Sequence, residues 1–164
     1  MKVNLVGWSR GAIIAVNVTN RLHLVPIEVN WIGLFDAVDR VPLFDMPNSI
    51  PSNTRKITHI VKTKDESWVL FPTVDIIASQ SSQIDKIILM NSDHSIVGGS
   101  SSDNVNTVMR SLYTMIENAK SAGVKMLPYP FTNSLEFSKK FIFWGIPDNG
   151  ISLSKYYTGE VFLK

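Results

Sequence analysis

The residues GWSRG, at positions 7–11, place Ser9 between two glycines in a G-x-S-x-G pattern. In enzymes with this pattern the serine lies on a sharp turn between a strand and a helix and attacks a carbonyl carbon. The flanking glycines avoid clashes of side chains with the neighbouring strand and helix. Chance alone gives the pattern in about one chain in twenty of this length, so an ordinary structural turn is the alternative.

The segments on both sides of Ser9 favour the catalytic interpretation. KVNLVG, at positions 2–7, is short and apolar and predicts a buried strand. From Arg10 to about Leu22, apolar and small residues recur at helical spacing. The backbone N–H of Arg10 would then lie at a helix N-terminus and point at the oxyanion that forms during attack.

A serine nucleophile needs a general base, and the chain has three histidines, His23, His59 and His94. His23 ends the helix after the serine and is expected to face away from it. His59 lies inside an expected strand, where a histidine is usually a core or face residue. His94 follows an expected strand at the C-terminal edge of the sheet, where open α/β sheets gather their active residues. We expect His94 to be the base.

The acid that orients this histidine has two main candidates. Asp36 ends the second expected strand and Asp65 follows the third, so both are expected at the same edge. A buried aspartate there would fix the imidazole tautomer and stabilise its charged form. Asp93 is expected to be an exposed loop residue, and Asp39 and Asp45 to be solvated. From the residues alone, the choice between Asp36 and Asp65 stays open.

The elements that must position these groups form an α/β pattern. Short apolar segments predict buried strands at 2–7, 29–36, 56–63 and 86–91. Strands that alternate with helices or loops predict a mostly parallel sheet with flanking helices in three layers. No repeat or long linker divides the chain, so we expect one domain over 1–164.

The most regular helix pattern covers 103–123, with one apolar face that we interpret as core. That face consists of Val105, Val108, Met109, Leu112 and Ile116. Ser102 or Asp103 can cap its start, and Gly123 fits the position after its end. The proline-rich stretch 41–53 is expected to be a surface excursion, and the role of 124–164 stays open.

Composition excludes several classes of protein. The absence of cysteine excludes a disulfide framework, a thiol nucleophile and thiolate zinc sites. The net charge of +2 is too small for a nucleic-acid-binding surface. No apolar run reaches the length of a membrane span, and the N-terminus is a poor signal peptide. We therefore expect a soluble cytoplasmic protein, or one exported by a signal-independent secretion system.

Four ordered segments resemble the motifs of an uncharacterised α/β-hydrolase family that includes phospholipase effectors of bacterial type VI secretion. They are GWSRGA, IGLFDAVD, HIVKTKDESWVLFP and DHSIVGG, and they cover roughly residues 3 to 100. The family reads GFSRGA, G-x-(W/F)-D-T-V, D-E-R and H-S-D-V-G-G at these places. The resemblance implies that Ser9 is the nucleophile, His94 the base and Asp36 the acid, with Asp65 in reserve.

The chain departs from the family motifs at three positions without touching this triad. Ile96 replaces an aspartate, Ala37 a threonine and Ser67 an arginine. These replacements bear on the substrate and on local loop geometry.

The position of the motif within the fold is a larger departure. In the hydrolase fold the nucleophile follows the fifth strand, whereas here its strand begins next to Met1. We expect the C-terminal part of such a fold, without the loop that supplies the second oxyanion N–H. The sheet edge exposed in this way would suit a second copy or a complementing chain.

These expectations combine into a serine ester hydrolase that works through an acyl-enzyme. The lipid-like ester, of lipase or phospholipase type, is implied by the resemblance. The alternative is a weak or inactive hydrolase remnant that serves as a binding module. Neither GWSRGA nor GGSSSD fits a phosphate-binding or dinucleotide-binding motif, and we expect no cofactor and no metal.

Overall fold

The computed structural model describes residues 2–39, 47–63, 72–79, 81–90, 92–99 and 104–125. In chain order the elements are β1 (Lys2–Trp8), α1 (Arg10–Leu24), β2 (Glu28–Phe35), β3 (Ser49–Ile50), β4 (Thr54–Lys62), β5 (Ile77–Ala78), β6 (Gln83–Leu89), α2 (His94–Val97) and α3 (Val105–Ser121).

The main sheet has four strands in the order β1-β2-β4-β6, and every neighbouring pair is parallel. The register aligns Trp8 of β1 with Phe35 of β2, and Phe35 with Ile60 of β4. The carboxyl ends of these strands therefore meet at one edge. The predicted mostly parallel sheet is confirmed, and each predicted strand is found within three residues of its expected start.

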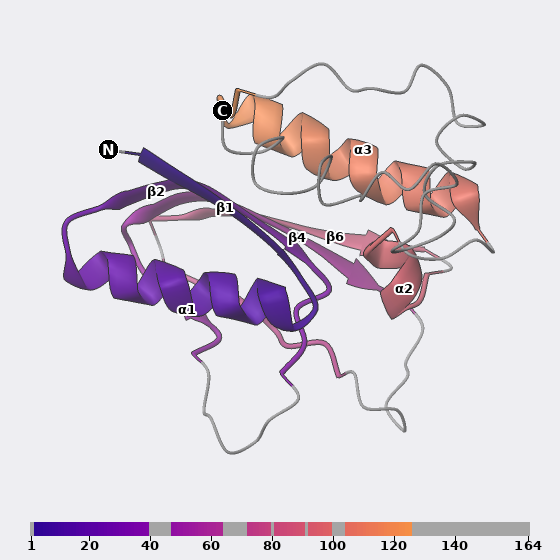
Figure 1. Cartoon of the computed structure of the whole chain (residues 1–164), viewed down its shortest axis with the longest axis horizontal. Coiled ribbons are helices and arrows are strands. Elements are labelled where there is room, and N and C mark those ends of the chain that lie inside the picture. The colour runs from indigo at the N-terminus through magenta and orange to yellow at the C-terminus, as the bar shows by residue number, and fades with distance from the viewer. Residues whose placement is uncertain are drawn as a thin grey trace, which may run out of the picture.

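Helices lie on both faces of this sheet (Figure 1). On one face, α1 packs on β1 and β2, and an apolar cluster there includes Val16 of α1, Ile32 of β2 and Ile57 of β4. On the other face, α2 and α3 pack through a second cluster that includes Trp31 and Met115. The amphipathic helices thus bury the two apolar surfaces of the sheet, as a parallel sheet requires.

The strands differ in burial according to their place in the sheet. β2 is buried at every residue after Glu28, because strands flank it and helices cover both of its faces. Within the described residues β1 pairs with β2 alone, and most of its side chains are half-buried.

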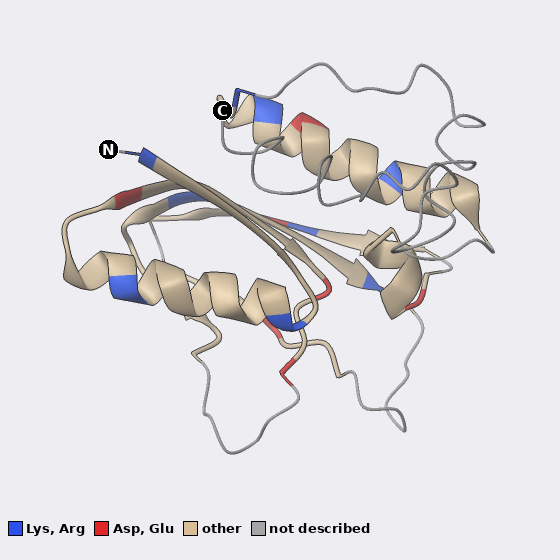
Figure 2. Cartoon of the chain, in the orientation of Figure 1, with Lys and Arg blue, Asp and Glu red and all other residues tan. Residues whose placement is uncertain are grey.

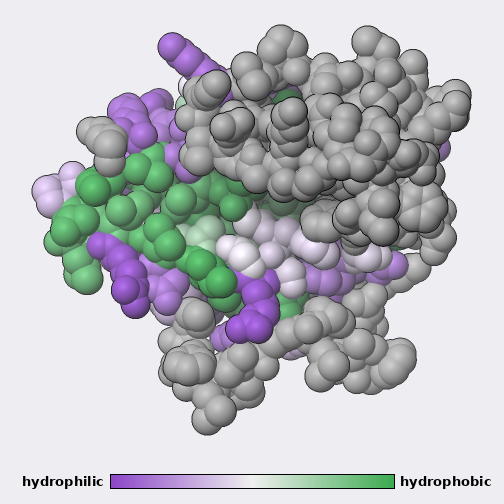
Figure 3. All heavy atoms as spheres, in the orientation of Figure 1, coloured by the Kyte–Doolittle hydropathy of each residue, from purple (hydrophilic) through white to green (hydrophobic). Residues whose placement is uncertain are grey.

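Figure 3 shows an apolar patch on the side of the molecule where β1 and α1 lie, and Val6 and Ile14 are among the exposed apolar residues of these elements. Charged residues of both signs are scattered along the described elements (Figure 2).

The predicted long helix is confirmed, but its cap is different from the one expected. α3 begins after Asn104, whose side-chain oxygen accepts from the Thr107 N–H at 3.2 Å. The expectation that Ser102 or Asp103 caps this helix is therefore wrong. Gly123 follows the helix with a φ of 78°, as predicted for this position.

The buried face of α3 is also wider than the predicted stripe. Met115 and Ala119 are fully buried, whereas Val105 and Ile116 are half-buried.

Part of the stretch expected as a surface excursion is structured. Ser49–Ile50 forms β3, which pairs in parallel with β5 in a second, two-stranded sheet. Ile50 is buried in the cluster beneath α1, and Asn20 of α1 donates a hydrogen bond to the Ser49 carbonyl at 2.8 Å. Ile50 is buried because it packs in this apolar cluster, whereas Ser49 stays exposed.

Candidate active site

Ser9 forms the turn between β1 and α1 in a strained backbone conformation. Its φ is 57° and its ψ is −125°, values that a non-glycine residue rarely adopts. Its N–H donates to the Phe35 carbonyl at 3.0 Å, and its own carbonyl accepts from the Ala12 and Val38 N–H groups. The turn is therefore held by backbone bonds to β2, to the loop after β2 and to α1.

The two glycines that flank this turn have different roles. A Cβ on Gly7 would contact the backbone of Gly11 and would lie 2.6 Å from the Ala12 nitrogen. A Cβ on Gly11 would have no neighbour within 4 Å. The expected clash is thus found at Gly7, where β1 and α1 approach each other, and the expectation of a clash at Gly11 is wrong.

Asp36 immediately follows β2 and is also in a positive-φ conformation. Its φ is 38°, its side chain is fully buried, and its N–H donates to the Ile60 carbonyl at 2.8 Å. This last bond extends the ladder between β2 and β4 by one residue, so the aspartate leaves the sheet at its carboxyl edge.

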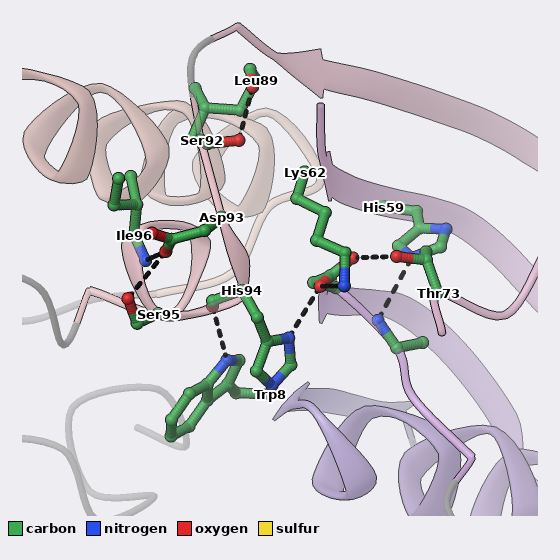
Figure 4. A network of polar contacts seen from close by, with 12 residues as sticks. Trp8, His59, Lys62, Thr73, Leu89, Ser92, Asp93, His94, Ser95 and Ile96 are labelled. Atoms are coloured by element: carbon green, nitrogen blue, oxygen red, sulfur yellow. Dashed lines mark hydrogen bonds and ion pairs between the residues drawn. The ribbon is translucent and has the colours of Figure 1, made fainter. Parts of the chain in front are cut away.

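The Asp36 carboxylate is contacted by three side chains from separate parts of the chain (Figure 4). The Nδ1 atom of His94 lies 2.7 Å from Oδ2, and the Thr73 hydroxyl donates to Oδ1 at 2.6 Å. The Nζ atom of Lys62, at the end of β4, lies 3.5 Å from Oδ2. Both carboxylate oxygens are therefore satisfied although water does not reach them.

These contacts determine the protonation state of the buried acid. Burial by itself would raise the pKa of Asp36, since it disfavours the charged form. The hydrogen bonds from His94 and Thr73 and the charge of Lys62 outweigh burial, so the pKa of Asp36 lies below its ordinary value. The carboxylate is therefore an anion at neutral pH and can accept a hydrogen bond from the Nδ1–H group of the imidazole.

His94 is the first residue of the short helix α2 and is buried. The loop expected here therefore contains a helical turn. Asp93 caps this turn, because its Oδ1 accepts from the Ile96 N–H at 2.8 Å and from the Ser95 hydroxyl at 2.7 Å. Asp93 is half-buried, which corrects the expectation of an exposed loop residue.

Trp8 joins the turn that holds Ser9 to the helix that holds His94. Its ring stacks on the imidazole with a centroid distance of 5.4 Å and an interplanar angle of 24°. Its indole N–H also donates to the His94 carbonyl at 3.4 Å (Figure 4). Sequence reasoning missed this residue, although its place directly before Ser9 was a signal that it must lie near the site.

The other two histidines are placed differently. His23 is exposed in the last turn of α1, at the end of the helix opposite to Ser9. His59 is buried in β4, and its Nε2 accepts from the Ala37 N–H at 3.4 Å. Burial, as the main cause, lowers the pKa of His59 to about 4, so this histidine is neutral at neutral pH.

Two of the residues that differ from the hydrolase motifs lie in the core. Ile96 and Ala37 are both buried, Ile96 against α3 and Ala37 in the cluster under α1. Asp39 is half-buried. The reserve acid Asp65, together with Asp45 and Ser67, lies outside the described residues.

Neither a metal-binding cluster nor a spanning segment is found in the described ranges. They contain no group of three or more His, Asp or Glu side chains placed to bind a metal ion. None of their helices combines the length and the apolar character of a membrane-spanning segment.

Comparison of the chain with family models, with curated proteins and with solved structures gave no match.

Proposed function

We propose that the protein is a serine hydrolase that cleaves an ester through an acyl-enzyme. The observation that carries this proposal is the contact between His94 and the buried Asp36, at 2.7 Å, at the same edge of the sheet as a serine in a strained strand-to-helix turn. A histidine oriented by a buried carboxylate is the base that a serine nucleophile needs. Trp8, the residue directly before the serine, supports the assignment because its ring stacks on the imidazole of His94.

In the proposed reaction, Ser9 Oγ attacks the carbonyl carbon of the ester while His94 Nε2 accepts its proton. The resulting imidazolium donates this proton to the leaving alkoxide as the tetrahedral intermediate collapses to the acyl-enzyme. Water then attacks the acyl group, again with His94 as the base, and the carboxylic acid and free Ser9 are released. Asp36 stays ionised throughout and holds the Nδ1 proton in place.

The Arg10 N–H is the proposed donor to the oxyanion. The first N–H groups of an α-helix have no acceptor within the helix, and they carry partial positive charge. Arg10 is the first residue of α1 and directly follows the nucleophile. A second N–H donor would raise the rate by about 10² to 10³.

The proposed substrate class is a lipid-like ester, as in lipases and phospholipases. This part of the proposal rests on the resemblance of GWSRGA and DHSIVGG to the hydrolase motifs. The fold consistent with it is the C-terminal part of an α/β-hydrolase, in which β1 is the strand that carries the nucleophile.

A fluorophosphonate probe, read by intact mass, tests the nucleophile directly. We expect one covalent adduct on the wild-type chain and none on Ser9→Ala or on heat-denatured protein. Ser121→Ala, an exposed serine at the end of α3, is the matched control and is expected to label like wild type.

An ester series of increasing acyl length, together with phospholipid vesicles, tests the substrate class. Preference for long chains would support a lipid-like ester, and preference for short chains would contradict it. A folded chain that forms no adduct would contradict the hydrolase proposal and favour the binding-module alternative.

A further inference from the structure

We propose that Trp8 stabilises the protonated form of His94 and positions this base during catalysis. This inference rests on the proposed hydrolase function and deepens it. It assigns a positioning role to the residue that precedes the nucleophile.

The contact between the two rings has the geometry of a cation–π pair. The imidazole of His94 lies nearly parallel to the indole of Trp8, with centroids 5.4 Å apart. A cation within about 6 Å of an indole centroid is attracted by the negative face of the ring. Because His94 is buried, water screens this attraction only weakly.

The attraction acts at the step where charge appears. His94 is neutral when it is ready to accept a proton and becomes an imidazolium when Ser9 attacks. The indole face therefore binds the transition state more strongly than the ground state, which is the condition for a rate increase. Among the described residues, the charged groups at this site include Asp36, which contacts Nδ1, and Lys62, which pairs with the same carboxylate.

The structure also explains how Trp8 is kept in this place. Its indole N–H donates to the His94 carbonyl, which also accepts from the Gly98 N–H at 3.3 Å. A Cβ on Gly98 would lie 2.8 Å from the Trp8 Cδ1 atom and still closer to other ring atoms. Gly98, in the DHSIVGG motif, thus leaves the space that the indole occupies.

Two substitutions of Trp8 separate the role of the ring from its role in packing. Trp8→Phe keeps an aromatic face but weakens the attraction and removes the N–H donor. Trp8→Leu keeps an apolar side chain without a π face. We expect Trp8→Leu to lower kcat on a soluble ester by about three- to thirty-fold, with Trp8→Phe between it and wild type. KM should change by less than about two-fold, because the effect arises after substrate binds.

Fluorescence gives a readout that does not depend on turnover. A stacked imidazolium quenches indole emission, so acidification should quench part of the wild-type emission reversibly. The quench should be absent in Trp8→Phe and in His94→Gln, and it should persist in Trp31→Phe, which removes a tryptophan in the core on β2. Circular dichroism and the melting temperature check that each variant is folded.

The outcomes separate this inference from the proposed function. Equal kcat in wild type and a folded Trp8→Leu, or an effect on KM alone, would contradict the inference while leaving the hydrolase intact. A wild type that the fluorophosphonate does not label would contradict the hydrolase and the catalytic part of the inference together. In that case a pH-dependent quench would still support the ring contact, and its absence would contradict it.

Discussion

Ser9 and Asp36 are the only two non-glycine residues of the described chain that have a positive φ. Their φ angles are 57° and 38°, and each is the first residue after a strand of the parallel sheet. A backbone hydrogen bond runs from the Val38 N–H, in the loop after Asp36, to the Ser9 carbonyl at 3.3 Å. The two strained turns therefore support each other at the same edge of the sheet.

Such conformations cost about 1 to 3 kcal/mol each, and they persist only where the surroundings impose them. Here the ladder bonds to Phe35 and Ile60 provide that constraint, since each accepts from the strained residue. Strained positions cluster at functional sites because they aim a side chain out of the sheet. This is the physical reason to test these two residues first.

Asp36→Asn is expected to lower kcat by about 10⁴ while the chain stays folded. An amide cannot hold the Nδ1 proton of His94 as the carboxylate does, so the imidazole presents the wrong tautomer to Ser9. Turnover of a soluble ester measures this effect. Asp75→Asn is the matched control, because Asp75 is an exposed aspartate that pairs only with Lys86 among the described residues, and it should keep wild-type activity.

A loss smaller than about ten-fold in Asp36→Asn would assign the acid to another residue. Asp65→Asn is then the decisive variant, since Asp65 is the other aspartate expected to follow a strand at this edge.

Gly7→Ala and Gly11→Ala are expected to have opposite effects on stability. An alanine at Gly7 would overlap the backbone of α1 at Gly11 and Ala12, where neither segment can yield, so we expect a loss of about 2 to 4 kcal/mol. An alanine at Gly11 meets open space in a helix, where replacing glycine stabilises by about 0.4 to 1 kcal/mol. Urea unfolding monitored by circular dichroism measures both. Equal destabilisation by the two substitutions would contradict the asymmetry.

Much of the fold was accessible from the sequence because the strands are short apolar segments with clear ends. The alternation of these strands with helices predicts a parallel sheet, and a parallel sheet brings its carboxyl ends to one edge. For this reason Ser9, His94 and the two candidate acids, Asp36 and Asp65, were expected at one edge of the sheet from chain position alone. The α1 pattern was equally direct, because its buried residues recur at helical spacing.

The features that were missed depend on contacts between segments far apart in the chain. Thr73 reaches Asp36 across 37 positions, and Trp8 reaches His94 across 86. Neither contact leaves a local periodic signal. The cap of α3 was misplaced because three adjacent residues, Ser102, Asp103 and Asn104, all have side chains that can cap a helix.

The strand β3 was missed because it is short and lies among prolines. Two residues are too few to show a strand pattern, and the nearby prolines favour a loop interpretation.

Lys62→Met is expected to make the protein more sensitive to acid. The pKa of Asp36 is lower in the folded chain than in the unfolded chain, where it is 3.8. The ionised carboxylate therefore stabilises the fold above pH 3.8, and this stabilisation is lost as the pH falls through the pKa of the folded chain. Removing the Lys62 charge raises the folded pKa of Asp36. The loss should therefore begin at higher pH, with a destabilisation of about 3 kcal/mol at neutral pH, the low end for a broken buried pair because His94 and Thr73 still contact Asp36.

Acid unfolding followed by circular dichroism measures the midpoint of this transition. Lys62→Arg retains the charge and is expected to unfold nearer the wild-type pH. If Lys62→Met and wild type unfold at the same pH, the charge of Lys62 does not hold Asp36 ionised.

His59→Gln is expected to remove part of the pH dependence of stability below neutral pH. The pKa of His59 falls from 6.5 to about 4 on folding, so between these values the unfolded chain binds more protons than the folded one. Stability from this group is complete above about pH 6.5 and is lost as the pH falls towards 4. In wild type this amounts to about 2 kcal/mol between pH 7 and pH 4.5.

Glutamine does not titrate, and its side-chain oxygen can accept the Ala37 N–H that His59 accepts now. Urea unfolding of wild type and His59→Gln at pH 7 and pH 4.5 gives the two slopes, and the variant should lose less stability on acidification. His23→Gln, which replaces an exposed histidine in the last turn of α1, should keep the wild-type slope. If His59→Gln also loses as much stability as wild type on acidification, burial does not lower the pKa of His59. This histidine would then be protonated in the folded chain while it lies against Ala37, in the loop after Asp36.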